Sequence, residues 1–294
     1  MSNVELAGNF QRFTVVGLGM LGGSIAKDLR ERFPDAEISA IDPASDNIEQ
    51  AIQEGVVDKA VTYEKIGRVA CFVIIASPLE TVVPIAQEVS SAIKSGENNS
   101  KRWIVIDTGS VKSDITSTFE ALTDEKVDFV STHPMAGTEF AGYAHSKKHL
   151  FRAKPWMVCR HDKNSDRAIL ATEDFIHSLG GSVREIDAQS HDKQAATSSH
   201  SVIMLSNLLF DFVATRHPEA LEIAGDGFTS TTRLASGNPR LHEEILKLNQ
   251  DLTKEILTEF IDYLRSMVGS DLELPADFFA HNKTRRNEWL RKRQ

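Results

Sequence analysis

The chain has 294 residues, which is enough for one large domain or two modest ones. Its hydrophobic fraction of 41% and its charged fraction of 26% are ordinary for a globular protein. A net charge of −9 argues against general binding to nucleic acid. The longest apolar stretch, Val202 to Val213, is too short and too polar to span a bilayer, so we expect neither a nucleic-acid nor a membrane partner.

The N-terminal residues lack a basic region followed by an apolar core, so no secretory signal is expected. Cys71 and Cys159 both lie inside apolar, strand-like runs, and we expect them to be reduced residues of the core. These features favour a cytoplasmic protein.

A glycine-rich turn follows the first apolar run of the chain, Phe13 to Val16, and has the pattern G-x-G-x-x-G. Gly17 would allow a tight turn, Gly19 would leave room for a pyrophosphate, and Gly22 would let the following helix pack closely on the strand. The free N–H groups at the start of that helix would face the phosphates. The pattern predicts a dinucleotide-binding loop, in which Leu21 also contacts the cofactor.

A second predicted strand, Ile38–Ile41, ends in an acidic residue, Asp42, which lies 42 − 22 = 20 positions after Gly22. An acid at this place accepts hydrogen bonds from the ribose hydroxyls of NAD and repels the 2′-phosphate of NADP. The next residues, Pro43 and Ala44, include no arginine that could hold a phosphate. NAD is therefore the expected cofactor.

Strand and helix patterns alternate as far as about residue 185, which predicts a Rossmann-type α/β fold with a doubly wound, mainly parallel sheet. The further predicted strands are 71–76, 103–107, 129–132, 156–160 and 182–185, and the further predicted helices are 47–53, 81–93, 111–122 and 165–179. We assign residues 1–187 to this NAD-binding domain.

Only helical patterns follow from about Ala188 onward. They are clearest over 189–215 and over 241–268, where apolar residues recur at spacings of three or four. We assign residues 188–294 to an all-helical domain. Its apolar stripe is expected to be core or, alternatively, a surface that pairs with a second subunit. The basic tail, 283–293, is expected to be a solvated helix end, with anion binding as the alternative.

Ligands of a doubly wound sheet bind beyond the carboxyl ends of its strands. The polar residues that follow the central predicted strands should therefore lie near the nicotinamide end of the cofactor. Ser77, Pro78 and Asp107 are expected to contact the cofactor. His133 is the best candidate for an acid–base group, because imidazole titrates near neutral pH, and Ser110 could orient it.

The helical half carries the pairs His191–Asp192 and Ser199–His200. It also carries Arg233, which is the best candidate for binding a substrate carboxylate through two parallel hydrogen bonds. Each of these residues taken alone would as readily be a structural polar residue. No metal site is expected.

Together these motifs resemble the prephenate/arogenate dehydrogenase family of tyrosine biosynthesis, and the resemblance covers nearly the whole chain. The motifs are Gly-Leu-Gly-Met-Leu-Gly-Gly-Ser at 17–24, Asp-Thr-Gly-Ser-Val-Lys at 107–112, His-Pro-Met-Ala-Gly-Thr-Glu at 133–139, His-Asp at 191–192, Ser-His at 199–200 and Thr-Arg-Leu-Ala at 232–235. The resemblance implies a Rossmann-type domain followed by a helical dimerisation domain, and hence a homodimer. It also implies NAD(P)-dependent oxidative decarboxylation of prephenate to 4-hydroxyphenylpyruvate or of arogenate to tyrosine.

By the same resemblance, His133 would take the proton of the ring hydroxyl and Ser110 would support His133. Arg233 would bind a carboxylate of prephenate, and His200 and Glu139 would line the substrate site. Hydride would leave the ring carbon that bears the hydroxyl, and loss of the ring carboxylate as carbon dioxide would make the ring aromatic.

The sequence departs from the family pattern at three positions that would lie near the substrate. Ile203, Ser230 and His242 stand where family members often have His, Asp and Trp. The substrate therefore stays open, and a relative that acts on 4-amino-4-deoxyprephenate in an antibiotic pathway is an alternative.

Two other readings lie further from this family. One is another two-domain NAD-dependent hydroxy-acid dehydrogenase. Such enzymes usually depend on a Lys-x-x-x-Asn pair, but Lys247 and Asn249 do not have that spacing, and no lysine between residues 188 and 240 has an asparagine four positions later. The other is a non-catalytic NAD-sensing protein. The joint presence of His133, Ser110 and Arg233 argues against it.

Overall fold

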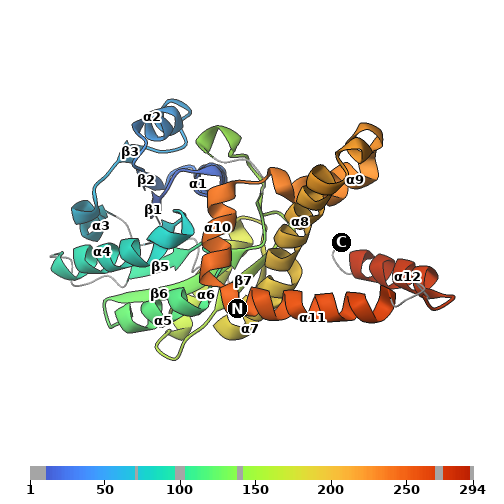
Figure 1. Ribbon diagram of the computed structural model, residues 1–294. Helices are drawn as coiled ribbons and strands as arrows, with labels where there is room; N and C mark the ends of the chain where they lie inside the picture. Colours follow the sequence, from blue (N-terminus) through green and yellow to red (C-terminus); the bar gives the residue numbers. More distant parts are fainter. Residues whose placement is uncertain (1–10, 70–71, 97–102, 138–141, 269–273, 292–294) are drawn as a thin grey trace.

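The computed structural model describes residues 11–69, 72–96, 103–137, 142–268 and 274–291, and it is built on one eight-stranded sheet (Figure 1). The strand order is β3-β2-β1-β4-β5-β6-β7-β8, and neighbouring strands are parallel except for the pair of β6 and β7. The strands are β1 Arg12–Val16, β2 Glu37–Ile41, β3 Lys59–Ala60, β4 Phe72–Ile75, β5 Trp103–Asp107, β6 Val127–Pro134, β7 Pro155–Cys159 and β8 Ser182–Glu185. The predicted Rossmann-type sheet is confirmed.

The sheet differs from the prediction at β6, which is longer at both ends than expected. His133 lies within this strand rather than after it, because the antiparallel strand β7 continues the pairing and sets His133 opposite Met157. The backbone of the expected acid–base residue is thus held by the sheet. The sequence analysis also missed β3 and the short helix α3, Tyr63–Val69.

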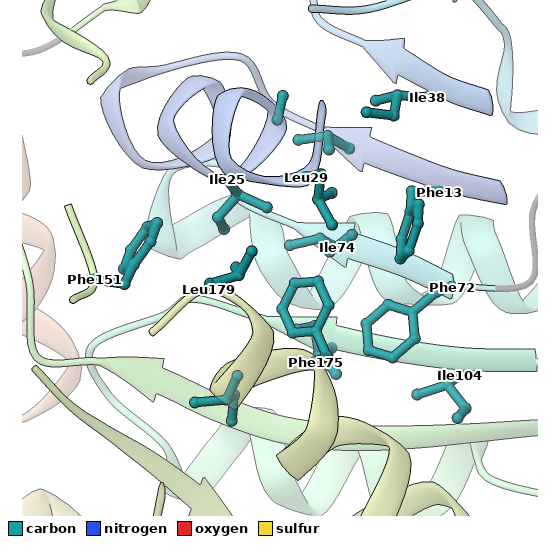
Figure 2. Close-up of a cluster of buried hydrophobic side chains, with 14 of the residues drawn as sticks. Phe13, Ile25, Leu29, Ile38, Phe72, Ile74, Ile104, Phe151, Phe175 and Leu179 are labelled. Carbon is teal, nitrogen blue, oxygen red and sulfur yellow. The ribbon is translucent and has the colours of Figure 1, made fainter. Parts of the chain in front are cut away.

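Helices cover both faces of the sheet. The helices of this half are α1 Met20–Arg32, α2 Ser45–Gln53, α3, α4 Val82–Ser95, α5 Ser113–Leu122 and α6 Asp166–Ser178. Successive strand residues point to opposite faces. Phe72 of β4 stacks on Phe175 of α6 with ring centroids 4.6 Å apart (Figure 2), whereas the next residue, Val73, packs in the cluster formed with α4 and α5. This alternation makes the two cores of a doubly wound fold.

The described residues after β8 contain no further strand, as expected. Their α-helices are α7 Ala188–Ala195, α8 Ser201–Arg216, α9 Asp226–Thr231, α10 Pro239–Leu248, α11 Gln250–Val268 and α12 Phe278–Arg291. A π-helical turn, Ala196–His200, joins α7 to α8. The apolar pattern over 241–268 is divided at Asn249, so that α10 stands beside the sheet while α11 extends away from it (Figure 1).

The helical half leaves large apolar side chains exposed, mainly on α8 and α11. They include Phe210, Phe212, Ile261, Tyr263 and Leu264. The described part of the basic tail, residues 283–291, belongs to the exposed helix α12. None of the helices in the described ranges is long and apolar enough to pass through a membrane. Of the two cysteines, Cys159 is a buried free thiol, whereas Cys71 lies outside the described residues.

Candidate active site

The glycine loop has a conformation that only glycine tolerates at two of its positions. Gly17 has a φ angle of +94°, and a Cβ atom there would lie 2.5 Å from the carbonyl oxygen of Ala76. A Cβ atom at Gly22 would lie 1.8 Å from the carbonyl oxygen of Gly17. The strand, the turn and α1 can approach this closely only because these side chains are absent.

Gly19 has a different environment, because a Cβ atom there would find no other atom within 4 Å. Gly19 is also the N-cap of α1, and no side chain caps its N–H groups. A helix N-terminus of this kind attracts anions. The loop therefore has the open space and the hydrogen-bond donors that a dinucleotide pyrophosphate requires.

Asp42 is fixed beside this loop at the end of β2. Its Oδ2 accepts the N–H of Leu18 at 2.5 Å, and its Oδ1 accepts the N–H of Ala44 at 2.8 Å and the Nδ2–H of Asn47 at 3.2 Å. The carboxylate remains partly exposed. It is thus held where the sequence places the ribose-binding acid.

A cleft of about 470 Å³ separates the glycine loop from the helical half. From the first half it is lined by Gly19, Leu21, Ser77 and Pro78, and from the second half by Arg233. The structure therefore brings four of the expected cofactor residues together with the residue expected to bind a carboxylate. A cleft between two domains is a common place for a cofactor and its substrate.

The cleft also contains Asn238 and His242, around the start of α10. The resemblance placed His242 near the substrate, whereas the sequence analysis did not assign Asn238. Burial lowers the pKa of His242. Asn238 is the N-cap of α10, where its side chain accepts the N–H of Arg240, and a capping asparagine gives no sequence signal of a ligand site.

A chain of hydrogen bonds supports His133, which is half-buried at the end of β6. Its Nδ1 lies 2.9 Å from Nε2 of His191, and Nδ1 of His191 lies 2.9 Å from Oδ1 of Asp192. The Asp192 carboxylate in turn accepts the backbone N–H groups of Lys112 at 2.7 Å and Ser113 at 2.8 Å. The network therefore runs from the N-terminus of α5 to the expected acid–base residue.

The pKa values of both His133 and Asp192 are lowered, which favours a neutral imidazole and an ionised carboxylate. Burial lowers the pKa of His133 well below its ordinary value, and neighbouring His191, Lys112 and His200 lower it further, while Asp192 partly offsets this. For Asp192, burial would raise the pKa of the carboxyl group, but hydrogen bonds from His191 and from α5 outweigh it and lower the pKa. A neutral His133 is ready to accept a proton.

His200 lies in the π-helical turn and is only 1% exposed. Asn249, at the break between α10 and α11, donates its Nδ2–H groups to Nδ1 of His200 at 3.1 Å and to the carbonyl oxygen of Asp192 at 2.9 Å. Burial lowers the pKa of His200 to about 4. Nδ1 of His200 is thus an acceptor, and Asn249 couples this side chain to the His191–Asp192 segment.

Two of the expected site residues, Asp107 and Ser110, have surroundings in the structure that the sequence did not reveal. Asp107 is fully buried, and its carboxylate is used by Nζ of Lys112 at 2.5 Å and by the N–H groups of Gly109 and Thr132. Its carboxylate therefore stabilises the turn after β5, and Asp107 is not among the residues that line the cleft.

Within the described residues no hydrogen bond joins Ser110 to His133, and Nδ1 of His133 is bonded to His191 instead. The side-chain partner of His133 in the structure is thus a residue 58 positions further along the chain. The support expected from Ser110 stays a prediction. Glu139, the other expected substrate contact, lies outside the described residues.

The buried neutral His200 should make the stability of the protein depend on pH. Its pKa is about 4 in the folded protein and about 6.5 in an unfolded chain, so its contribution is complete above pH 6.5 and is lost as the pH falls toward 4. The full contribution is about 3 kcal/mol. Urea unfolding at pH 4 to 7 should show a free energy of unfolding that falls less steeply in His200→Gln than in the unmodified protein. Parallel curves would contradict this.

Comparison with known proteins gives a consistent family. Residues 25–185 match the family model for the prephenate dehydrogenase nucleotide-binding domain, and residues 187–284 match that for the prephenate dehydrogenase dimerization domain. The chain is 28% identical over 260 residues to prephenate dehydrogenase of Bacillus subtilis, covering 86% of this chain and 67% of that protein. It is 26% identical over 275 residues to cyclohexadienyl dehydrogenase of Zymomonas mobilis, covering 88% and 87%.

Solved structures give the same result. Prephenate dehydrogenase from Aquifex aeolicus, solved in complex with hydroxyphenyl propionate and NAD+, matches 95% of this chain and 98% of its own with a TM-score of 0.83 at 25% identity. Synechocystis arogenate dehydrogenase shares the fold, with a TM-score of 0.77 at 22% identity over 95% and 99% of the two chains. With both family domains in order along one chain, the protein belongs to the prephenate dehydrogenase family of oxidoreductases.

Proposed function

We propose that this protein is an NAD-dependent dehydrogenase that oxidatively decarboxylates prephenate or arogenate. The observation that carries the proposal is the single cleft that joins Gly19 and Leu21 of the dinucleotide loop to Arg233 of the helical half. His133 does not itself line this cleft. It lies at the end of β6, and the following loop reaches the cleft at Gly137. Support for NAD comes from the glycine geometry, from Asp42 and from the Aquifex aeolicus relative, which was solved with NAD+.

In the proposed reaction, Arg233 and His133 have separate roles. Arg233 pairs with a carboxylate of the substrate and thereby orients the ring. Nε2 of His133 accepts the proton of the ring hydroxyl as it becomes a carbonyl. When bound, NAD supplies the acceptor for the hydride that leaves the same carbon. The ring carboxylate then leaves as carbon dioxide, and the ring becomes aromatic.

Which substrate the cleft binds should depend on the wall that carries Arg233. His242 lies on that wall, whereas Ile203 is buried in the core and offers no polar group to a ligand. The relatives include a prephenate dehydrogenase and a cyclohexadienyl dehydrogenase. Prephenate and arogenate are therefore the first two substrates to test, and 4-amino-4-deoxyprephenate is the third.

The test is a direct assay of the purified protein with NAD and each of the three compounds, followed by absorbance at 340 nm. Reduction of NAD with prephenate or arogenate would support the proposed function. Reduction with the amino compound alone would assign the protein to the alternative pathway. If none of the three is oxidised while NAD still binds, the proposed function is wrong and an NAD-sensing role is favoured.

His133 and Arg233 should fail in different ways. His133→Asn should lower kcat by about 10²–10⁴-fold and leave KM nearly unchanged, because the base acts in the transition state. Arg233→Ala should raise KM at least about tenfold with a smaller change in kcat, because the carboxylate contact is made before and during the reaction. Steady-state kinetics and NAD titration by fluorescence would measure both. A near-normal kcat in His133→Asn would identify another residue as the base.

Asp42 should determine the preference for NAD. The double variant Asp42→Ser/Pro43→Arg removes the negative charge that repels a 2′-phosphate and adds a positive charge that attracts it. The ratio of kcat/KM for NAD to that for NADP should therefore fall. The interpretation of Asp42 would be refuted by an unmodified protein that already uses NADP better than NAD.

We also propose that the division between residues 1–187 and 188–294 separates a cofactor domain from a dimerisation domain. The exposed apolar side chains of α8 and α11 would then meet those of a second subunit. Leu264→Glu on α11 should weaken the dimer. Leu170→Glu on α6, an equally exposed leucine of the other half, is the matched control and should not. Light scattering at micromolar concentration would test this, and a monomeric unmodified protein would contradict it.

A further inference from the structure

The contact between His133 and His191 raises a question of proton placement, because two imidazole nitrogens face each other at 2.9 Å. For these two atoms to share a hydrogen bond when both rings are neutral, one of them must carry a hydrogen and the other must not. Which one carries it decides whether His133 can act as a base toward a substrate, since a nitrogen that already holds a proton cannot accept another.

The hydrogen bonds of Asp192, at the other end of this network, determine which nitrogen carries the hydrogen. Its Oδ2 accepts two hydrogen bonds from Ser113, through the backbone N–H at 2.8 Å and through Oγ–H at 2.5 Å, and its Oδ1 accepts the N–H of Lys112. A carboxylate so supplied with donors at a helix N-terminus stays ionised. It can only accept, so Nδ1 of His191 must donate to it.

With its proton on Nδ1, a neutral His191 has a lone pair on Nε2. Nδ1 of His133 must then donate to that lone pair, which leaves the lone pair of Nε2 of His133 available. The proton of each neutral ring is therefore assigned by one buried carboxylate. The same logic holds in serine proteases, where an aspartate sets the tautomer of the catalytic histidine.

We propose that His191 and Asp192 form a positioning pair for His133: they hold its proton on Nδ1 and share the positive charge that forms when Nε2 accepts the substrate proton. The proposal rests on the proposed dehydrogenase function. The protons balance in this step. The hydroxyl proton passes to Nε2 of His133, the proton on Nδ1 can shift to Nε2 of His191, and Asp192 remains a carboxylate throughout.

The charges around His133 show why the carboxylate is needed. A positive charge on His133 is opposed by a charged His191, by the buried ammonium group of Lys112 at the N-terminus of α5, and by His200 from the π-helical turn. His191 can therefore take the proton from Nδ1 of His133 but cannot hold a second charge beside it. Asp107 pairs with Lys112 and so reduces its effect. Asp192, from α7, is the carboxylate that the His191 ring connects to His133. Without it, the charge gained during the reaction would be opposed on all sides.

Asp192 also has a structural role, because it caps α5 from the opposite half of the protein. The experiment must therefore separate positioning from folding. His191→Leu removes the acceptor for Nδ1 of His133, whereas His191→Gln offers a carbonyl oxygen to the same atom but cannot take up a proton. His161→Gln is the control, since His161 is another buried histidine, bonded to the carbonyl oxygen of Phe129.

We expect His191→Leu to lower kcat at least about 100-fold with little change in KM, and His191→Gln to recover at least about tenfold of that loss. His161→Gln should keep nearly normal kinetics. In Asp192→Asn the acidic limb of the kcat/KM profile should move to lower pH, because losing the negative charge lowers the pKa of His133. A purely structural role would lower the rate without moving that limb. Equal rates for the Leu and Gln variants would refute the proposal.

A second measurement needs no turnover. In the ¹⁵N-histidine-labelled protein, NMR of the ring nitrogens reports which atom of each imidazole carries the proton, and His133→Asn and His191→Gln assign the two rings. A proton on Nδ1 of both rings supports the pair, and a proton on Nε2 of His133 overturns it. This holds even if His191→Leu does not fold. An unmodified protein that gives this NMR result but oxidises none of the three compounds would disprove the proposed function alone.

Discussion

The carboxylate of Asp192 is the point on which the arrangement of the two halves depends. It belongs to α7, yet its hydrogen bonds go to the N-terminus of α5 in the other half. A buried carboxylate is costly unless donors surround it, and here the backbone N–H groups of Lys112 and Ser113 have few other partners at a helix start. Each half thus satisfies polar groups that the other half leaves open.

Several features follow from this contact. The start of α5 is fixed directly after the turn in which Asp107 and Lys112 form their buried ion pair. The ring of His191 is directed toward β6, where the antiparallel pairing with β7 holds His133. Asn249, which lies at the helix break between α10 and α11, bonds the carbonyl oxygen of the same Asp192 and also His200. Three segments distant in sequence are therefore aligned by one residue.

The fold could be predicted from the sequence because its signals are local. Glycine spacing, apolar runs and an acid at the end of β2 each act within about 30 residues, and the structure places Gly19, Ser77, Pro78 and Arg233 in one cleft. The support of His133 could not be predicted, since His191 lies 58 positions away and no spacing reports such a contact. Asp107 was expected to contact the cofactor because it lies at a strand end, and the sequence did not reveal that its carboxylate pairs with a buried lysine five residues later.

The glycines of the dinucleotide loop serve two different requirements, close packing of the backbone and space for a ligand, which the sequence motif alone does not distinguish. Gly17 and Gly22 admit no Cβ atom, so a side chain at either position would force the strand and helix apart. Gly19 faces open space, and a methyl group there would touch no protein atom. Two glycines of the motif are thus needed for the fold, and the third leaves space where we propose that the pyrophosphate binds. At such a site, one larger side chain in place of Gly19 would block the cofactor without disturbing the fold, which is a short evolutionary route from an enzyme to an inert relative.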